Sequence, residues 1–154
     1  MTAIVDVKVK KLENFDEALP LPSYETEGAA GADLRASLGP NESMTVKAGE
    51  RVLVPTGLSY EIPVGYEIQV RPRSGLSLKT NLLIVNSPGT VDSDYRGELK
   101  VIIGNFGNED AIINHGDRVA QMVLAPVTQA RLVVSNDLTD TERGAGGFGS
   151  TGVN

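Results

Sequence analysis

The sequence predicts an all-β domain of the jelly-roll or barrel kind, and three observations lead to this prediction. Apolar and polar residues alternate in several short runs, as they do in strands with one buried face. Turn-forming residues separate these runs. No stretch of twelve residues carries a helical apolar period, and the best helix candidate is the short segment Ser74–Lys79. Many short strands at this spacing favour a closed or sandwiched antiparallel fold.

The expected strands follow one another along the whole chain. Val5, Val7 and Val9 alternate with charged residues in the first run. A hairpin is predicted where two alternating runs flank Pro63-Val64-Gly65. In chain order the expected strands are Val5–Val9, Arg51–Val54, Leu58–Ile62, Tyr66–Val70, Leu82–Val85, Leu99–Ile103, Ala111–Ile113, Val119–Leu124 and Arg131–Val134.

Length and composition limit the function classes. The 154 residues give a prior of one domain, and 40% apolar with 22% charged residues is typical of a globular chain. A net charge of −6 argues against a nucleic-acid or membrane-surface binder. No window approaches 18 uncharged apolar residues, so a soluble cytoplasmic protein is expected. Without cysteine and with one histidine, His115, a zinc or thiol enzyme is disfavoured.

The C-terminal stretch differs from the rest of the chain. Residues 144–152 read GAGGFGSTG, and glycine this dense is costly to order. One interpretation is a disordered tail. The other is a mobile lid, in which Arg143 and backbone amides wrap a phosphate and Phe148 covers a ring. The letters also match G-x-G-x-x-G, but too few residues follow for the helix that a dinucleotide site requires.

Basic residues gather in the middle of the chain. Six of the 14 lie between residues 71 and 118, which suits one local anion site as well as scattered surface charge. Pro72–Leu76 ends an alternating run and opens the helix candidate. We expect Ser74 to cap this helix and Gly75 to let backbone amides approach an anion. An ordinary capped turn is the alternative.

A second polar segment, Asn86–Glu98, lies between two strand-like runs. It could form a strand–turn–strand unit that reads a nucleobase edge through its backbone and Asn86. Tyr95 could then lie against a sugar, and Asp92 could position and deprotonate a water molecule. A long polar hairpin loop is the alternative interpretation.

Together these segments resemble the five motifs of the homotrimeric dUTPases, in family order from about residue 28 to residue 152. The motifs read Ala30–Leu34, Pro72–Lys79, Asn86–Glu98, Gly116–Gln121 and Arg143–Gly152. Each one is short, but five in register make a specific match.

The resemblance implies a jelly-roll-like β-clip fold in a single domain, residues 1–142, followed by a flexible C-terminal lid, residues 143–154. It implies a homotrimer whose subunits share each active site. The implied reaction is hydrolysis of dUTP to dUMP and diphosphate with Mg²⁺ on the triphosphate. This would lower dUTP and supply dUMP for dTMP synthesis.

The resemblance also implies roles for single residues. Asp92 would be catalytic, and Asp33 would hold a metal-bound water rather than Mg²⁺ itself. Phe148 would stack on uracil, and Tyr95 would pack on the deoxyribose. The implied substrate-binding residues are Arg73, Ser74, Gly75, Asn86, Thr90, Val91, Asp92, Tyr95, Lys100, Gln121, Arg143, Phe148, Gly149, Ser150 and Thr151.

Two alternatives stay open at this point. A dCTP deaminase shares the scaffold but places a catalytic glutamate further along the strand after the hairpin, where this chain is apolar at Val101-Ile102-Ile103. A nucleotide sensor without activity could also use the fold, because fold alone does not fix function. Incubation with dUTP and dCTP would separate the three, by release of diphosphate, ammonia or neither.

Overall fold

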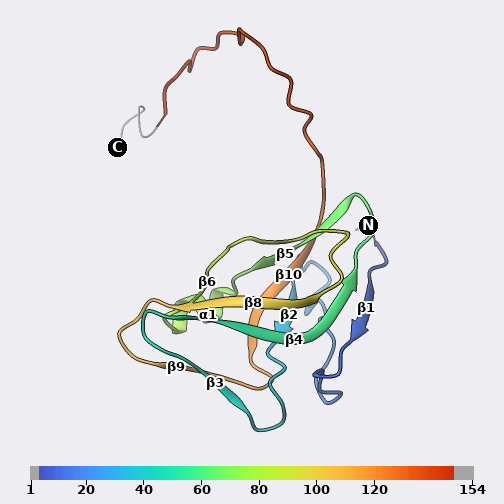
Figure 1. Cartoon of the computed structure of the whole chain (residues 1–154), viewed down its shortest axis with the longest axis vertical. Coiled ribbons are helices and arrows are strands. Elements are labelled where there is room, and N and C mark those ends of the chain that lie inside the picture. Colours follow the sequence, from blue (N-terminus) through green and yellow to red (C-terminus); the bar gives the residue numbers. More distant parts are fainter. Residues whose placement is uncertain (1–3, 148–154) are drawn as a thin grey trace.

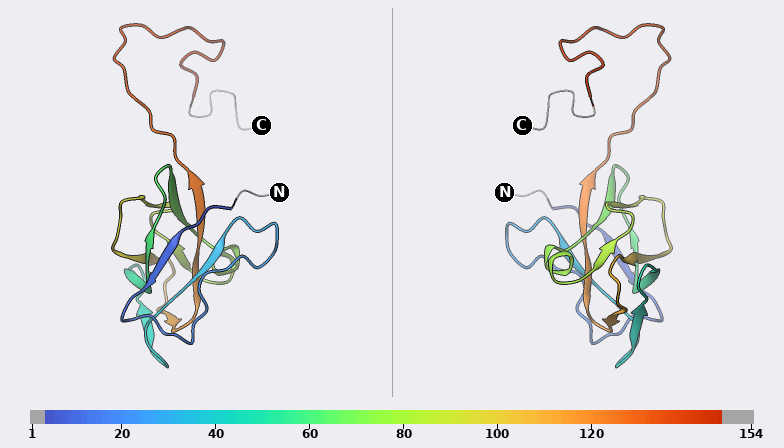
Figure 2. Two further views of the ribbon diagram at one scale, coloured as in Figure 1. Left: turned by 90° about the vertical axis from the view of Figure 1, so that its right-hand side faces the viewer. Right: turned by 90° about the vertical axis from the view of Figure 1, so that its left-hand side faces the viewer.

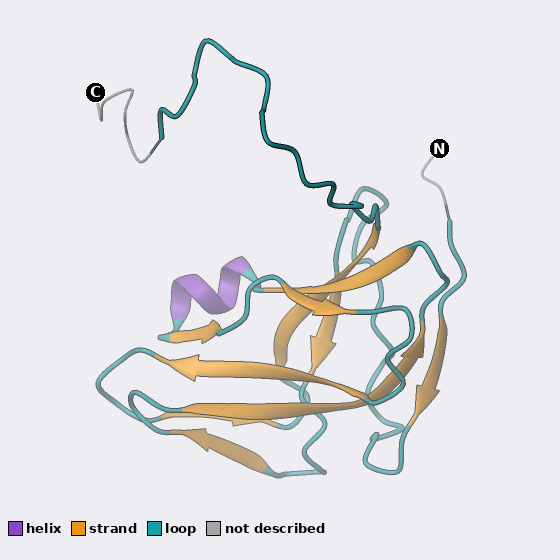
Figure 3. Cartoon of the chain, turned by 45° about the horizontal axis from the view of Figure 1, so that its top comes forward, coloured by secondary structure: helices purple, strands orange, loops and turns teal. Residues whose placement is uncertain are grey.

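The computed structural model describes residues 4–147 as a β-domain with one short helix (Figures 1 and 3). The elements of this part of the chain are β1 (Lys8–Lys11), β2 (Ala32–Arg35), β3 (Ser43–Val46), β4 (Arg51–Glu61), β5 (Tyr66–Arg71), α1 (Ser74–Lys79), β6 (Leu82–Ile84), β7 (Gly89–Val91), β8 (Glu98–Asn105), β9 (Ala111–Asn114) and β10 (Arg118–Pro126).

The strands form two four-stranded antiparallel sheets and one two-stranded sheet. The first sheet has the order β1-β4-β8-β6 and the second has the order β2-β10-β5-β7. β3 pairs with β9 in the small sheet. This architecture confirms the predicted all-β jelly-roll class.

The core lies between the inner faces of the two large sheets. Alternation produces this core: in β8, Leu99, Val101 and Ile103 are buried, whereas Lys100 faces outward. Ile68 and Val70 of β5 are buried on the facing sheet, and they belong to the same cluster of apolar side chains. Burial of these side chains is the main favourable term for folding.

Strand pairing corrects two sequence expectations. β4 and β5 do not form the hairpin predicted around Pro63-Val64-Gly65. β4 pairs with β1 and β8, and β5 pairs with β10 and β7, so the turn links different sheets. A hairpin signature reports alternation and a turn, but it does not say which edge each strand joins.

The segment between β6 and β8 has a mixed outcome. β6 and β8 pair, so the strand–turn–strand unit exists. However, the connecting chain crosses to the other sheet, where β7 pairs with β5 and places Val91 opposite Ile68. The polar segment is therefore anchored on both sheets.

Other boundaries also differ from expectation. The first strand begins at Lys8 rather than Val5, and β2, β3 and β7 were not predicted. Helix α1 has the expected bounds, but its N-cap residue is Arg73 and no side chain caps it, so the Ser74 cap is wrong. Ser74 is already inside the first turn.

β10 ends at Pro126, and the described chain beyond it, residues 127–147, leaves the body (Figure 2). The strand expected at Arg131–Val134 is absent there, and Leu132, Val133 and Val134 are exposed. Within residues 4–147 no strand pairs with this arm, so its apolar pattern has no sheet edge to join there. Among the described residues no helix is long and apolar enough to cross a membrane.

Candidate active site

One group of charged side chains joins β2 to the ends of β5 and β10. Asp33 on β2 accepts a hydrogen bond from Arg73 Nε at 2.6 Å through Oδ1 and one from Arg118 Nη1 at 3.2 Å through Oδ2. The Asp33 carboxylate is only 16% exposed. A carboxylate held between two guanidinium groups fixes Arg73 at the N-cap of α1 and Arg118 at the start of β10, which suits recognition of an anion.

Gln121 lies next to this anion cluster, which consists of Asp33, Arg73, Arg118 and Gln121. The strand register places Gln121 opposite Asp33 on one side and Arg71 on the other. Its Nε2 donates to the Pro72 carbonyl at 2.8 Å, so the side chain braces the turn before the helix. Ser74 and Gly75 follow in that first turn, and both are exposed. Their backbone N–H groups therefore remain accessible.

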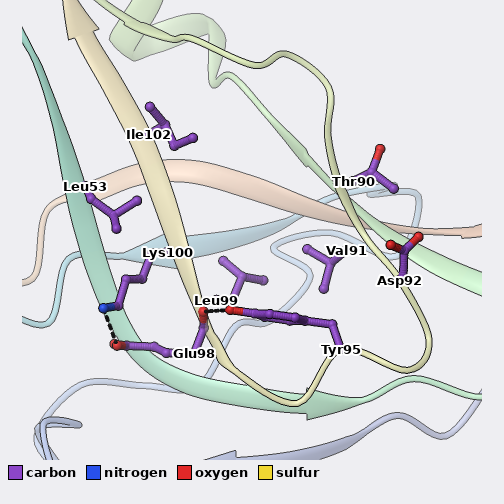
Figure 4. A pocket seen from close by; sticks show the side chains of 9 residues that line it. All are labelled: Leu53, Thr90, Val91, Asp92, Tyr95, Glu98, Leu99, Lys100 and Ile102. Atoms are coloured by element: carbon purple, nitrogen blue, oxygen red, sulfur yellow. Dashed lines mark hydrogen bonds and ion pairs between the residues drawn. The ribbon is translucent and has the colours of Figure 1, made fainter.

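A cavity of about 420 Å³ lies elsewhere on the molecule, between β7, β8 and β4 (Figure 4). Thr90, Val91 and Asp92 form one wall, and Tyr95 crosses the middle. The opposite wall consists of Leu53, Glu98, Leu99, Lys100 and Ile102. This polar and apolar mixture is typical of a small-molecule site.

Tyr95 is held in place at this cavity. Its hydroxyl donates to the Glu98 carbonyl at 3.1 Å. The ring lies directly over Gly97, where a Cβ atom would come within 2.3 Å of the Tyr95 hydroxyl. A residue with a side chain at position 97 would therefore displace the ring. The flat face of Tyr95 is fixed as one surface of the cavity.

The two acidic groups of the cavity differ in their surroundings. Asp92 is exposed, and its carboxylate has no hydrogen-bond or ion-pair partner among residues 4–147. Glu98 is mostly buried, and its Oε2 lies 3.4 Å from Lys100 Nζ. Asp92 is therefore the carboxylate that is open to water and to a bound ligand.

Asn86 stands outside the walls of this cavity. It follows β6 in the turn that leads to β7, and its side-chain nitrogen packs close to Gly89. The residue is exposed. Its position in the crossing segment places it next to the β7 wall rather than in the anion cluster.

The anion cluster and the cavity lie at opposite ends of β5. Asp33 and Arg71 both lie opposite Gln121, so the anion cluster marks the C-terminal end of β5. At the other end, Val91 pairs with Ile68, and the chain after Val91 continues toward Glu67. Asp92 and Glu67 both line a second surface pocket, distinct from the cavity described above. Arg71 lies four residues beyond Glu67 in the extended strand β5, so their Cα atoms are roughly 13 Å apart. One chain therefore does not bring Asp92 to the anion cluster.

Arg143 is the C-terminal candidate that lies within residues 4–147, and it is not gathered with either group. Arg143 is exposed on the arm, and its Nε donates to the Gly146 carbonyl at 2.8 Å. Phe148, Gly149, Ser150 and Thr151 lie outside the described residues.

His115 forms a structural junction. Its Nδ1 accepts hydrogen bonds from the backbone N–H groups of Leu38 and Gly39, both at 3.1 Å, and its Nε2 lies 3.0 Å from Asp16. These contacts tie three segments of the body together, in line with the sequence interpretation of a turn residue.

Sequence reasoning missed two residues of these sites. Arg118 was counted among the basic residues that suit a local anion site but was not named as a site residue, and the structure pairs it with Asp33. Its place beside Gly116 and Asp117 in the fourth motif was the available signal. Glu98 carried no signal, because its contacts come from distant parts of the chain. Residues 4–147 contain no group of three or more His, Asp or Glu side chains that could hold a metal ion.

Comparison with known proteins adds to this geometry. The sequence matches the family described as dUTPase over residues 17–152. It is 58% identical over 147 residues to the deoxyuridine 5'-triphosphate nucleotidohydrolase of Bdellovibrio bacteriovorus, and the match covers 95% of each chain.

Solved structures show the same fold. A dUTPase variant of Staphylococcus bacteriophage 80alpha with bound dUpNHpp aligns with a TM-score of 0.83 at 26% identity, covering 96% of this chain and 99% of the other. A dUTPase variant of phage phi11 of S. aureus, described with a structural Mg(II) ion, aligns at 0.74 and 24% identity, covering 86% and 98%.

Proposed function

The chain belongs to the dUTPase family and hydrolyses dUTP, and we propose that Asp92 is its catalytic residue. Asp92 accepts a proton from a water molecule, which attacks the α-phosphorus in line and displaces diphosphate. The products are dUMP and diphosphate, so the reaction lowers dUTP and supplies dUMP for dTMP synthesis. The open and unpaired Asp92 carboxylate supports this role, because a base that is already paired holds protons less readily.

The anion cluster is the proposed triphosphate site. Arg73 supplies a planar set of donors, Gln121 supplies an amide, and Ser74 and Gly75 present free backbone N–H groups. The fixed geometry of Arg73 on Asp33 supports this assignment, because little freedom is lost when the substrate binds.

The cavity is the proposed nucleoside site. Tyr95 packs on the deoxyribose and excludes a 2′-hydroxyl, and the backbone of Thr90 and Val91 with Asn86 pairs with uracil. Lys100 faces the nucleotide from the other wall. A missing methyl contact alone discriminates by only about 1–3 kcal/mol, so steric clash at C5 must reject thymine.

Magnesium enters on the substrate in this proposal. The missing acidic cluster in residues 4–147 and the two arginine partners of Asp33 leave no protein-only metal site there. Each Asp33 oxygen keeps a second lone pair, which can accept a hydrogen bond from a metal-bound water. When bound, Mg²⁺ neutralises phosphate charge.

We propose a homotrimer in which the Asp92 cavity of one subunit meets the anion cluster of another. The separation of roughly 13 Å along β5 supports this, because the water-activating carboxylate must lie within hydrogen-bond reach of the attacking water. An exposed apolar row crosses the outer face of the first sheet. It consists of the exposed Leu53, Leu83 and Val85 together with the half-buried Ile102, which pairs with Leu53 across β4 and β8. Such a row is typical of a subunit interface.

The arm completes the assembly. Residues 127–142 carry exposed apolar side chains. In the proposed trimer these side chains pack on a neighbouring subunit, and residues 143–154 form a lid. In the lid, Arg143 with Gly149, Ser150 and Thr151 holds the γ-phosphate, and Phe148 stacks on uracil. The enzyme acts in the cytoplasm, where nucleotide pools are made.

The observation that carries this proposal is the separation of Asp92 from Arg73 in one chain, and subunit mixing tests it. Asp92→Asn and Arg73→Gln each remove one half of the site. Unfolding and refolding the two variants together at equal amounts should restore about a quarter of wild-type sites, because random assembly gives that fraction one intact copy of each half. Each variant refolded alone is the control.

Mixed refolding that restores no activity would mean that both halves act within one subunit. The wild-type enzyme should release diphosphate from dUTP and no ammonia from dCTP. Ammonia from dCTP would instead support a deaminase on this scaffold.

A further inference from the structure

Glu98 has an anchored carboxylate at the wall of the nucleoside cavity. Its Oε1 accepts two hydrogen bonds at 2.8 Å, one from Asn14 Nδ2 and one from the backbone N–H of Gly57. The side chain is only 14% exposed. Two donors on one oxygen fix the rotation of the carboxylate and therefore the place of the second oxygen.

The Gly57 donor is available because β4 is irregular at this point. The register of β4 with β8 shifts between Pro55 and Ser59, and Gly57 has a φ of +70°. A side chain there would meet the backbone of Phe15, since a Cβ atom would lie 2.6 Å from its Cα. The bulge frees an N–H from the ladder, and Glu98 satisfies it. The carboxylate is thus tied to the rigid body of the sheet.

The second oxygen of Glu98 faces the cavity. Oε2 lies 3.4 Å from Lys100 Nζ, and both side chains line the wall opposite Asp92 (Figure 4). Lys100 is the only basic residue among the cavity-lining side chains of the described chain. It is 39% exposed, so the ion pair adds little to folding stability.

The flexible Lys100 side chain needs a partner such as Glu98 to hold its ammonium group in one place. A lysine side chain has four rotatable bonds, and confining it on binding costs conformational entropy. The backbone carbonyl of Glu98 also accepts the Tyr95 hydroxyl, so the same residue touches both side chains proposed to face the nucleoside.

We propose that Glu98 is a positioning residue for nucleotide binding, which holds the Lys100 ammonium at the cavity wall before the substrate arrives. This inference rests on the proposed function, because it requires the cavity to be the nucleotide site. Glu98 does not touch the reacting atoms in this role, and it acts through Lys100.

The test is a double-mutant cycle on Glu98 and Lys100, with dUTP as substrate. Glu98→Gln keeps an acceptor for Asn14 and Gly57 but loses the charge that holds Lys100. It should raise KM by about 3- to 5-fold, as expected for an exposed ion pair, and leave kcat nearly unchanged. Lys100→Met should raise KM at least as much, and Glu98→Gln should add nothing in the Lys100→Met background.

Glu61→Gln is the matched control, because it makes the same change in an exposed ion pair with Lys8 that does not line the cavity. It should keep the wild-type KM. The proposal is overturned if Glu98→Gln has a wild-type KM, if its full effect persists in the Lys100→Met background, or if Glu61→Gln raises KM equally. Wild-type protein that released no diphosphate from dUTP would instead refute the proposed function.

Discussion

The anion cluster lies on the second sheet, the nucleoside cavity lies between β7 of that sheet and β4 and β8 of the first, and the two are built in different ways. In the anion cluster, the half-buried Asp33 carboxylate is held between Arg73 and Arg118. In the cavity, Asp92 is exposed and has no partner within residues 4–147. One carboxylate is a fixed structural centre, and the other is open.

This difference follows from the work that each group does in the proposed site. Binding a triphosphate needs donors held in advance, so a half-buried carboxylate that orients two arginines is useful there. A general base needs a carboxylate that a water molecule can reach. Substitution of Asp33 and of Asp92 should therefore affect different measurements.

The largest effect is expected for Asp92→Asn. The variant keeps the shape of the cavity but has no base, so turnover should fall by about 10²–10⁴-fold while much of the dUTP binding remains. Steady-state kinetics and binding calorimetry measure the two quantities. Turnover close to that of the wild type would show that Asp92 is not the general base.

Deletion of residues 143–154 tests whether the anion cluster and the nucleoside cavity support full turnover without a lid. The described part of the arm, residues 127–147, pairs with no strand of residues 4–147, so we expect an unchanged Tm and an intact trimer by sedimentation. Turnover should fall on the order of 10²-fold, far more than dUTP binding weakens, because closure mainly excludes water and orients the phosphates. An unfolded truncation would show that the segment is structural.

Asp33→Asn should act on stability as well as on binding. The substitution leaves Arg73 and Arg118 without their carboxylate, and these groups are partly screened by water. The free energy of unfolding should fall by about 1–2 kcal/mol, and KM for dUTP should rise by about 10-fold. Urea unfolding and kinetics on the same sample measure both. Unchanged stability would mean that the cluster is not a fixed structural centre.

Glu61→Gln is the matched control with the smallest expected effect. Glu61 pairs with Lys8 at 2.8 Å on the exposed edge of the first sheet. The hydrogen bond and charge of Lys8 hold the pKa of Glu61 below its ordinary value of 4.5. The pair therefore contributes above that pH, and its contribution is lost as the pH falls through the lowered pKa.

At pH 7 the Tm of Glu61→Gln should differ from wild type by less than about 1 °C, and this difference should shrink as the pH falls below 4.5 through the lowered pKa of Glu61. A loss of stability as large as that of Asp33→Asn would contradict the contrast between the two ion pairs.

Local patterns predicted much of the fold. Alternation in β5 and β8 was sufficient to place buried and exposed side chains, because a strand has a side-chain period of two. Helix α1 was predicted with its correct bounds. Short strands such as β2 and β7 were missed, because three or four residues carry too little periodicity to stand out. Strand pairing was also not predictable, since alternation does not name the partner edge.

The sequence by itself determined the fold class, the family and the residue types at each site. Motif order and alternation are properties of neighbours along the chain. Only the tertiary structure decided that Asp33 pairs with Arg118, that Glu98 anchors on a bulge at Gly57, and that Asp92 stands a strand's length from Arg73. These facts depend on contacts between residues 41 to 85 positions apart and on strand register. Such contacts form only when burial of the two sheet faces brings distant segments together.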